Sequence, residues 1–157
     1  MPELAGRDTA AIFAHMKTLF AAACILLFTS LSLVAGGPET ITDIKAALAK
    51  AKAENKLLFL QMGRADCENC QALRAMVAKK QVQLPTTKFV YADVNSDDAS
   101  TMRVFRYKFK VIGSTLPFVV VAAPDGTQLG ARSGYGSAAE FEKLIREASK
   151  KAPASKS

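Results

Sequence analysis

The chain has 157 residues, of which 50% are hydrophobic and 22% are charged, and it carries a net charge of +7. This length suits one domain with its own core and is short for two. The lysines and arginines look scattered along the sequence rather than interleaved with aromatic residues on one element, so the composition argues against nucleic-acid binding.

Residues 1–37 are expected to lie outside the folded domain. After an N-terminal extension, Lys17 precedes a nearly uncharged run over 18–35, and small residues follow, as they do at a signal-peptidase site near Ala35 or Gly36. This pattern predicts export, with the bacterial periplasm as the expected compartment. The run is also close to the shortest length that crosses a bilayer, so an uncleaved membrane anchor is the alternative, and it would be the expected membrane contact.

The first half of the remaining chain is expected to alternate helices with strands. Apolar residues at three- and four-residue spacing predict a helix that is capped by Thr40 or Thr42 and ends near Asn55. The apolar run "LLFLQM" at 57–62 lacks alternation, as a strand buried on both faces does. A second helix is expected to begin at Cys67.

The second half continues the alternation and then adds a hairpin. The segment "KFVYADV" at 88–94 predicts a strand, and "NSDDAS" at 95–100 offers capping oxygens for a helix. A further strand is expected at 117–123, and the "PDG" turn at 124–126 should return the chain antiparallel to it. Ser137 is expected to cap the last helix.

This order of elements predicts an α/β fold. Strands joined through helices pair in parallel, whereas the hairpin adds antiparallel pairing, so we expect a mixed central sheet with helices on both faces. The folded domain should span 38–149. Residues 150–157 are polar and contain proline, and we expect them to form a disordered tail.

Cys67 and Cys70 are separated by Glu68 and Asn69, and they stand where a strand should give way to a helix. The free N–H groups and the positive end of the helix favour a thiolate at Cys67, and a thiolate is the species that attacks disulfides. Cys70, one turn further on, can close a disulfide with Cys67 while being more shielded. We therefore expect a redox-active disulfide and no other cofactor.

Such a pair of cysteines has other possible uses. A structural disulfide is disfavoured because so small a ring contributes only about 2 kcal/mol. A zinc site is not expected, since the other candidate ligands, Cys24 and His15, lie in the export region. Two thiolates do suit Cu(I), so a copper-binding or metallochaperone role stays open.

The chain resembles the thioredoxin family over roughly residues 44–148, and most closely its exported disulfide-interchange domains and periplasmic thioredoxin-like proteins. The resemblance lies in four segments in the expected order: "LLFLQMGRADCENC", "FVYADVN", "LPFVVVAAPDG" and "GYGSAAEFEKLI". It implies the thioredoxin fold and thiol:disulfide oxidoreductase activity, with Cys67 as nucleophile and Cys70 as resolving thiol. It also implies that Pro117 is a cis-proline beside the disulfide and that the Leu116 backbone pairs with an extended substrate segment.

Three departures from the family pattern bear on activity. Asp66 stands in place of the usual tryptophan, Gln61 in place of a buried acid, and the loop "GSTLP" before Pro117 is about two residues longer than is common. These departures leave a non-catalytic binding module with the same fold open as an alternative.

The acidic residues Asp66 and Glu68 flank Cys67 and oppose the formation of its thiolate. This stabilises the disulfide relative to the dithiol, so the centre is expected to lean reducing. The expected partners are a disulfide-containing protein substrate and a dithiol protein that returns electrons, because the sequence contains no nucleotide or flavin motif.

Overall fold

The computed structural model describes residues 37–110 and 113–153. The predicted signal or anchor segment, Cys24 within it, and the last four residues of the predicted tail lie outside the described residues. None of the helices in the described ranges combines the length and hydrophobicity that crossing a membrane requires.

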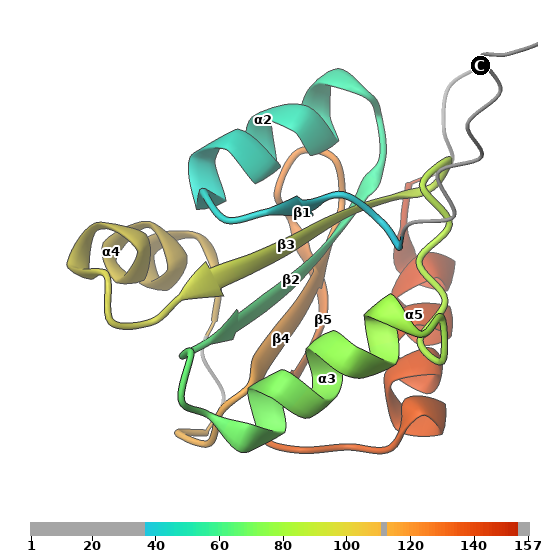
Figure 1. The fold of residues 1–157 in the computed structure, drawn as a ribbon. Helices are drawn as coiled ribbons and strands as arrows, with labels where there is room; N and C mark the ends of the chain where they lie inside the picture. Colours follow the sequence, from blue (N-terminus) through green and yellow to red (C-terminus); the bar gives the residue numbers. More distant parts are fainter. Residues whose placement is uncertain (1–36, 111–112, 154–157) are drawn as a thin grey trace, which may run out of the picture. The chain divides into compact units, whose positions relative to one another are not determined.

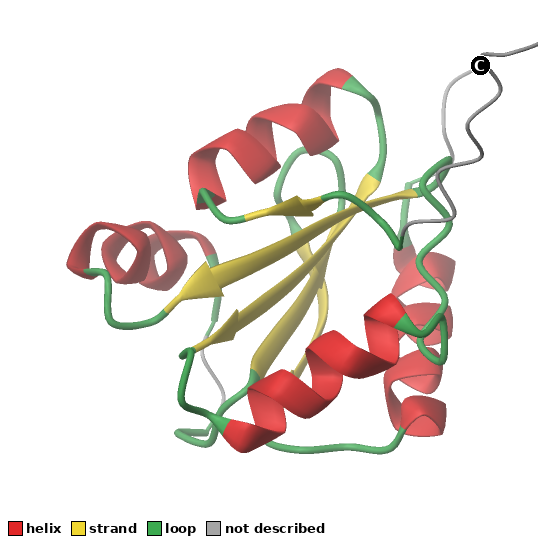
Figure 2. Cartoon of the chain, in the orientation of Figure 1, coloured by secondary structure: helices red, strands yellow, loops and turns green. Residues whose placement is uncertain are grey.

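The described residues form a five-stranded sheet with helices packed on it (Figures 1 and 2). In chain order the elements are β1 (Thr40–Ile41), α2 (Ile44–Ala53), β2 (Leu57–Gly63), α3 (Glu68–Ala78), β3 (Phe89–Asn95), α4 (Ala99–Lys108), β4 (Phe118–Ala122), β5 (Gln128–Ser133) and α5 (Ala138–Lys151). The strands are ordered β1-β3-β2-β4-β5 across the sheet. β1, β3 and β2 run parallel, and β4 is antiparallel to both β2 and β5, so the predicted mixed sheet is confirmed.

The helices cover the sheet in two layers, with α2 and α4 on one face and α3 and α5 on the other (Figure 1). Side chains of a strand alternate between the two faces. In β2, Leu58 and Leu60 therefore face the α2/α4 layer, whereas Phe59 and Gln61 face the other layer. Every residue of β4 is buried, as the uninterrupted apolar run predicts.

The start of the domain differs from the prediction. Thr40 and Ile41 do not belong to the first helix but form β1, which pairs in parallel with Tyr91 and Ala92 of β3. Asp43, rather than a threonine, caps α2, because its Oδ1 accepts a hydrogen bond from the Ala46 N–H at 2.6 Å. Aspartate is at least as good an N-cap as threonine, and the extended backbone before it is free to add to the sheet edge.

The later elements follow the prediction more closely. Asp98 caps α4, and Ser137 caps α5 in a capping box with Glu140. The hairpin between β4 and β5 turns through Gly126, whose φ is +87°. α5 continues to Lys151, so the first two residues expected in the disordered tail are helical.

Candidate active site at the start of α3

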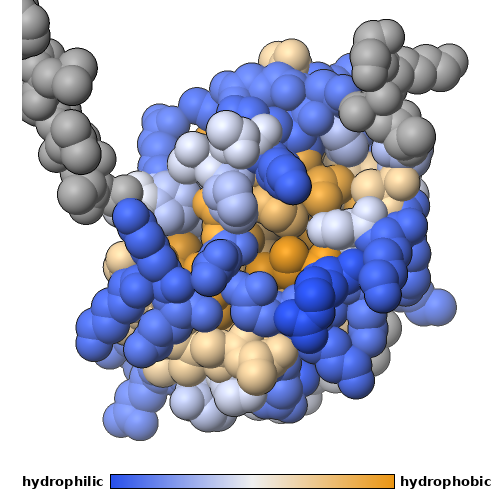
Figure 3. All heavy atoms as spheres, turned by 90° about the vertical axis from the view of Figure 1, so that its right-hand side faces the viewer, coloured by the Kyte–Doolittle hydropathy of each residue, from blue (hydrophilic) through white to orange (hydrophobic). Residues whose placement is uncertain are grey.

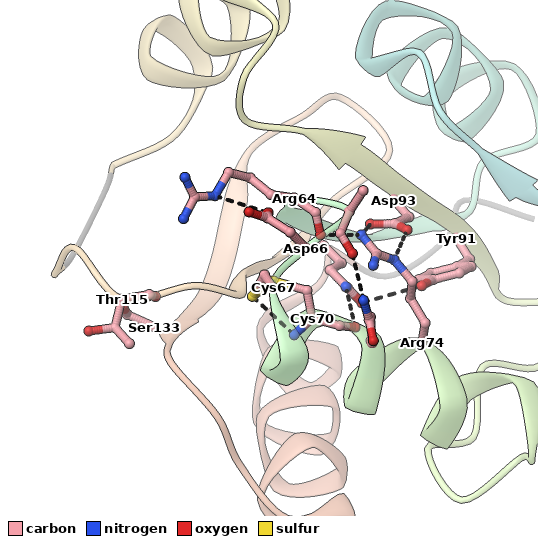
Figure 4. Close-up of a disulfide and its surroundings, with 12 residues drawn as sticks. Arg64, Asp66, Cys67, Cys70, Arg74, Tyr91, Asp93, Thr115 and Ser133 are labelled. Carbon is pink, nitrogen blue, oxygen red and sulfur yellow. Dashed lines mark hydrogen bonds and ion pairs between the residues drawn. A yellow bond between two sulfur atoms is a disulfide. The ribbon is translucent and has the colours of Figure 1, made fainter.

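Cys67 and Cys70 form a disulfide at the N-terminal end of α3 (Figure 4). Their Cα atoms lie 5.2 Å apart. Cys67 is the N-cap residue of α3, and its sulfur accepts a hydrogen bond from the Cys70 N–H at 3.2 Å. The pair thus lies between a buried strand and a helix, as the sequence predicts.

The two sulfur-bearing residues differ in exposure. Cys67 is partly exposed, whereas Cys70 is 0% exposed. The capping position explains this difference, because the N-cap residue has an extended backbone outside the helix, while Cys70 faces inward with Leu73 and Val77. A reagent from solvent therefore reaches one residue of the pair and not the other.

Gly63, the last residue of β2, makes room for Cys70. A Cβ atom at Gly63 would lie 2.6 Å from Cys70 Sγ and 3.0 Å from Cys70 Cβ. Cys70 cannot move outward without leaving the buried face of α3, so a side chain at residue 63 would have to displace the sulfur. The glycine is required for the close packing of strand and helix at the disulfide.

Gln61 lies beneath α3 and is 0% exposed. Its Nε2 donates to the Cys70 carbonyl at 3.0 Å, and its Oε1 accepts from the Tyr91 hydroxyl at 3.3 Å. Burial raises the pKa of Tyr91, with a further rise from Asp93 and an opposing effect of Arg74. The Tyr91 hydroxyl therefore stays protonated and donates its hydrogen bond to Gln61. The side chains of Gln61 and Tyr91 beneath Cys70 are thus neutral.

A charged pair beside this site was missed in the sequence. Arg74 of α3 and Asp93 of β3 form an ion pair through Nε and Nη2 of the arginine and both carboxylate oxygens (Figure 4). Asp93 is the one charged residue in an otherwise apolar or aromatic buried strand segment, 89–94, and this was the available signal. A carboxylate in such a strand requires a cation or several donors nearby.

Three hydrogen bonds hold the end of β2 and the loop before Cys67, one from the segment after β3 and two from α3. They run from Ser96 N–H to the Gly63 carbonyl (2.8 Å), from Arg74 Nη2 to the Arg64 carbonyl (3.2 Å) and from Gln71 Nε2 to the Ala65 carbonyl (2.6 Å). Arg74 thus connects α3, β3 and the loop that positions Cys67.

The acidic residues that flank Cys67 both lie at the surface. The side chain of Asp66 is 80% exposed, and its Oδ1 lies 3.8 Å from Arg64 Nε. Glu68 is exposed in the first turn of α3, where the positive end of the helix favours a carboxylate. Each acid thus has a partial compensation, Asp66 from Arg64 and Glu68 from the helix N-terminus.

Leu116 and Pro117 lie at the same end of the sheet as the disulfide. β4 begins opposite the end of β2, where Phe118 pairs with Met62, and the cysteines follow the end of β2. The Leu116–Pro117 peptide bond is cis. The Thr115 carbonyl accepts from Ser133 Oγ at 2.7 Å and from the Gly134 N–H at 2.9 Å. Within the described residues, the backbone N–H and carbonyl of Leu116 make no such bond, and its side chain is half-buried.

A depression of about 310 Å³ borders the loop before Cys67 and is lined by Gly63, Arg64 and Arg74 among others. In the described ranges, no three side chains of His, Cys, Asp or Glu are placed to share a metal ion. A depression of about 490 Å³ lies at the other end of α3, lined by Val77, Val82 and Leu84 among others. Apolar residues are also visible between hydrophilic ones on the face seen in Figure 3. Cys67 itself is partly exposed at the surface.

The comparisons with known proteins agree with this geometry. The family model for the thioredoxin-like domain matches residues 44–149. No curated protein matched the chain.

Among solved structures, a thioredoxin from Thermus thermophilus is 24% identical, with a TM-score of 0.57 over 75% of this chain and 92% of that one. A mutant thioredoxin from Halobacterium salinarum NRC-1 is 21% identical, with a TM-score of 0.53 over 70% and 88%. The thioredoxin NaTrxh from Nicotiana alata is 15% identical, with a TM-score of 0.53 over 71% and 93%. At these identities the likeness shows the fold.

Proposed function

Because the chain belongs to the thioredoxin-like family, we propose that it is a thiol:disulfide oxidoreductase that acts on protein disulfides through Cys67 and Cys70. The observation that carries this proposal is the disulfide itself, which joins a partly exposed cysteine to a fully buried one at a helix N-terminus. A purely structural disulfide needs no such asymmetry.

In the reducing direction the reaction begins with the Cys67 thiolate. It attacks one sulfur of the substrate disulfide, forms a mixed disulfide and releases the other substrate sulfur, which takes up a proton. The Cys70 thiol loses its proton and displaces the substrate sulfur from Cys67. This leaves the Cys67–Cys70 disulfide and a reduced substrate, so two electrons and two protons pass from the dithiol to the substrate.

The surroundings of the pair support the two roles. The Cys70 N–H that contacts Cys67 Sγ, together with the helix N-terminus, favours negative charge on Cys67. Cys70 is protected from competing reagents until the mixed disulfide forms beside it. We further propose that the substrate chain pairs with the backbone of Leu116, beside Pro117, as an extended segment.

We also propose that the centre acts in the reducing direction and that the protein is exported. The acidic residues Asp66 and Glu68 on either side of Cys67 support a reducing centre. A reduction potential between about −200 and −270 mV would support this direction, and a value above about −150 mV would contradict it. The apolar run over 18–35 supports export to the periplasm, where a dithiol protein would have to return the electrons.

The decisive experiment is trapping with Cys70→Ser in the full chain that also carries Cys24→Ser. Without Cys70 the mixed disulfide cannot be resolved, so covalent adducts at Cys67 should accumulate and dissociate on reduction. Cys67→Ser is the matched control and should trap none. Equal trapping by both variants, or none by either, would reject the assigned roles.

Reduction of insulin by the wild-type protein distinguishes an oxidoreductase from a non-catalytic binding module. A non-catalytic binding module would form adducts as Cys70→Ser and yet show no turnover as wild type. A copper-binding role would instead appear as tight Cu(I) binding by the reduced protein without disulfide reduction.

A further inference from the structure

α4 gathers positive charge on its outer face, although the charges look scattered along the sequence. Arg103, Arg106 and Tyr107 follow each other at helical spacing along α4, Lys110 comes two residues after its end, and all four are exposed. Tyr107 is 87% exposed, more than Tyr135, which is 53% exposed. These four residues are called the α4 outer face below.

We propose that the α4 outer face binds an acidic segment of the protein whose disulfide is reduced at Cys67. This inference rests on the proposed function and adds a substrate class to it: disulfide proteins that carry several carboxylates a few residues from the reacting cysteine. Its physical basis is uncompensated charge, an exposed aromatic side chain and continuity with the disulfide site.

The cations of this face are uncompensated. Within the described residues, none of Arg103, Arg106 or Lys110 forms an ion pair, whereas Lys50, Arg74 and Arg132 do. The sequence from 99 to 124 contains no Asp or Glu at all. The nearest acids along the chain, Asp97 and Asp98 before α4 and Asp125 after this range, form no ion pair with these cations in the described residues, so the face attracts carboxylates.

Helix stability alone does not explain these residues. Cations in the last turn of a helix interact favourably with its dipole, which accounts for Arg106 and Lys108. Lys108 also points toward the hairpin turn, where its Nζ lies 3.8 Å from the position of a Cβ at Gly126. Arg103 lies further from the helix end, and Tyr107 adds exposed apolar surface without packing. Tyrosine and arginine are the residues that dominate binding energy in protein interfaces.

The α4 outer face borders the reaction site through the loop before Pro117. Arg106 and Met102 of α4 line a depression of about 240 Å³ together with residues of this loop, among them Thr115 and Leu116. A substrate segment paired with the Leu116 backbone would thus leave the disulfide beside Arg106. The span from Arg103 to Tyr107 is about 6 Å along the helix axis, which two extended residues cover.

The acidic residues beside Cys67 indicate where the carboxylates of the substrate should lie relative to its disulfide. Asp66 and Glu68 flank Cys67 and repel carboxylates next to the reacting disulfide. The acidic residues should therefore lie several positions away, over α4. A protein segment fits this arrangement better than a nucleic acid or a lipid surface. A protein can carry both carboxylates and a disulfide that reacts with Cys67, whereas nucleic acids and lipids carry phosphates but no disulfide.

The test uses the pre-reduced full chain with Cys24→Ser, so that Cys67 and Cys70 are the only thiols. The probes are two fluorogenic disulfide-bridged peptides, one with four glutamates before the disulfide and one with four glutamates after it. Each has a counterpart with four glutamines in the same positions. In a single turnover at low salt, we expect one glutamate peptide to react about tenfold faster than its glutamine counterpart. The preference should shrink as salt is raised.

Arg103→Glu with Arg106→Glu should abolish this preference, measured as the ratio of the rates with the glutamate and glutamine peptides. The matched control is Arg146→Glu with Lys150→Glu on α5, an equal change of charge on the opposite layer, and it should keep the preference. Circular dichroism of both double variants checks folding.

Other outcomes overturn the inference in distinguishable ways. Equal rates with glutamate and glutamine peptides, or a preference that survives Arg103→Glu with Arg106→Glu, would refute the acidic substrate while the proposed function stands. No exchange with any peptide would refute both. Equal peptide rates with binding to anionic vesicles or single-stranded DNA, lost in that variant, would assign the face to another polyanion.

Discussion

The two faces of the central sheet bury different kinds of side chain. Toward α2 and α4, the buried residues of the strands are apolar, such as Leu60, Val120 and Phe118. Toward α3 and α5, the core is apolar near Phe59 and Phe141 but becomes polar near the disulfide, where Gln61 and Tyr91 lie. The same strands thus serve two purposes, since residues facing one layer form a hydrophobic core and residues facing the other also support the cysteines.

This difference separates stability from chemistry. Apolar packing depends on volume and tolerates similar shapes, whereas a buried hydrogen bond fixes distance and direction. We therefore expect changes on the α2/α4 face to alter the free energy of unfolding alone. Changes on the α3 face should also alter the behaviour of Cys70.

The largest effect is expected on the apolar face. Phe105 is 1% exposed, and its ring centroid lies 5.4 Å from that of Phe109 and 5.5 Å from that of Phe118. Phe105→Ala should lower the free energy of unfolding by about 3–5 kcal/mol, measured by chemical denaturation. Phe105→Leu is the control and should cost less. The distinction between the faces fails if Phe105→Ala also shifts the reduction potential.

Gly63→Ala tests the crowding beneath Cys70. The added Cβ would approach the sulfur within 2.6 Å, so we expect a loss of about 1–3 kcal/mol and slower resolution of the mixed disulfide. Gly130→Ala is a matched control, because its Cβ would meet the flexible end of Leu144 at 2.9 Å. If both variants resolve a preformed mixed disulfide at the wild-type rate, Gly63 has no special role.

The ion pair of Arg74 and Asp93 should contribute about 1–2 kcal/mol, since their side chains are still 31% and 14% exposed. Asp93→Asn and Arg74→Gln should each lose this amount. The double variant should lose less than the sum of the two. Hydrogen exchange of the loop amides at residues 64–66 should increase with Arg74→Gln, and unchanged protection would show that the arginine does not hold the loop.

The smallest effect is expected at Tyr91. Tyr91→Phe leaves Gln61 Oε1 without its donor and should cost about 1 kcal/mol at neutral pH. In the unfolded chain the phenol ionises near its ordinary pKa of 10.0, whereas burial raises the pKa in the folded protein. The stabilisation is therefore complete below pH 10 and is lost as the pH rises above it.

Denaturation at several alkaline pH values measures this dependence. Wild type should lose stability above pH 10 more steeply than Tyr91→Phe, while the exposed Tyr107→Phe should behave as wild type. Parallel curves for wild type and Tyr91→Phe would mean that Tyr91 ionises as readily in the folded chain as in the unfolded one.

Much of the fold follows from local patterns in the sequence. The run at 57–62 lacks alternation because both of its faces are buried, and Ser137 precedes a helix with the spacing of a capping box. β1 was missed because a two-residue strand has no periodicity of its own. It exists through pairing with β3, about fifty residues further along the chain, which no local pattern reveals.

The candidate site was only partly predictable for a similar reason. The order of strand, cysteines and helix places Cys67 outside and Cys70 inside, as the structure has them. Arg74 and Asp93 lie on different elements with a loop between them, and only the packing of α3 on β3 brings them together. The lone acid in an apolar strand signals that a partner exists but not which one.

The unequal exposure of the two cysteines has a consequence for oxidative stress. A peroxide that arrives from solvent meets Cys67 first, because Cys70 is covered. A sulfenic acid formed at Cys67 would have the Cys70 thiol beside it, and condensation of the two regenerates the disulfide with loss of water. We expect this burial to keep the centre from advancing to irreversible sulfinic and sulfonic acids.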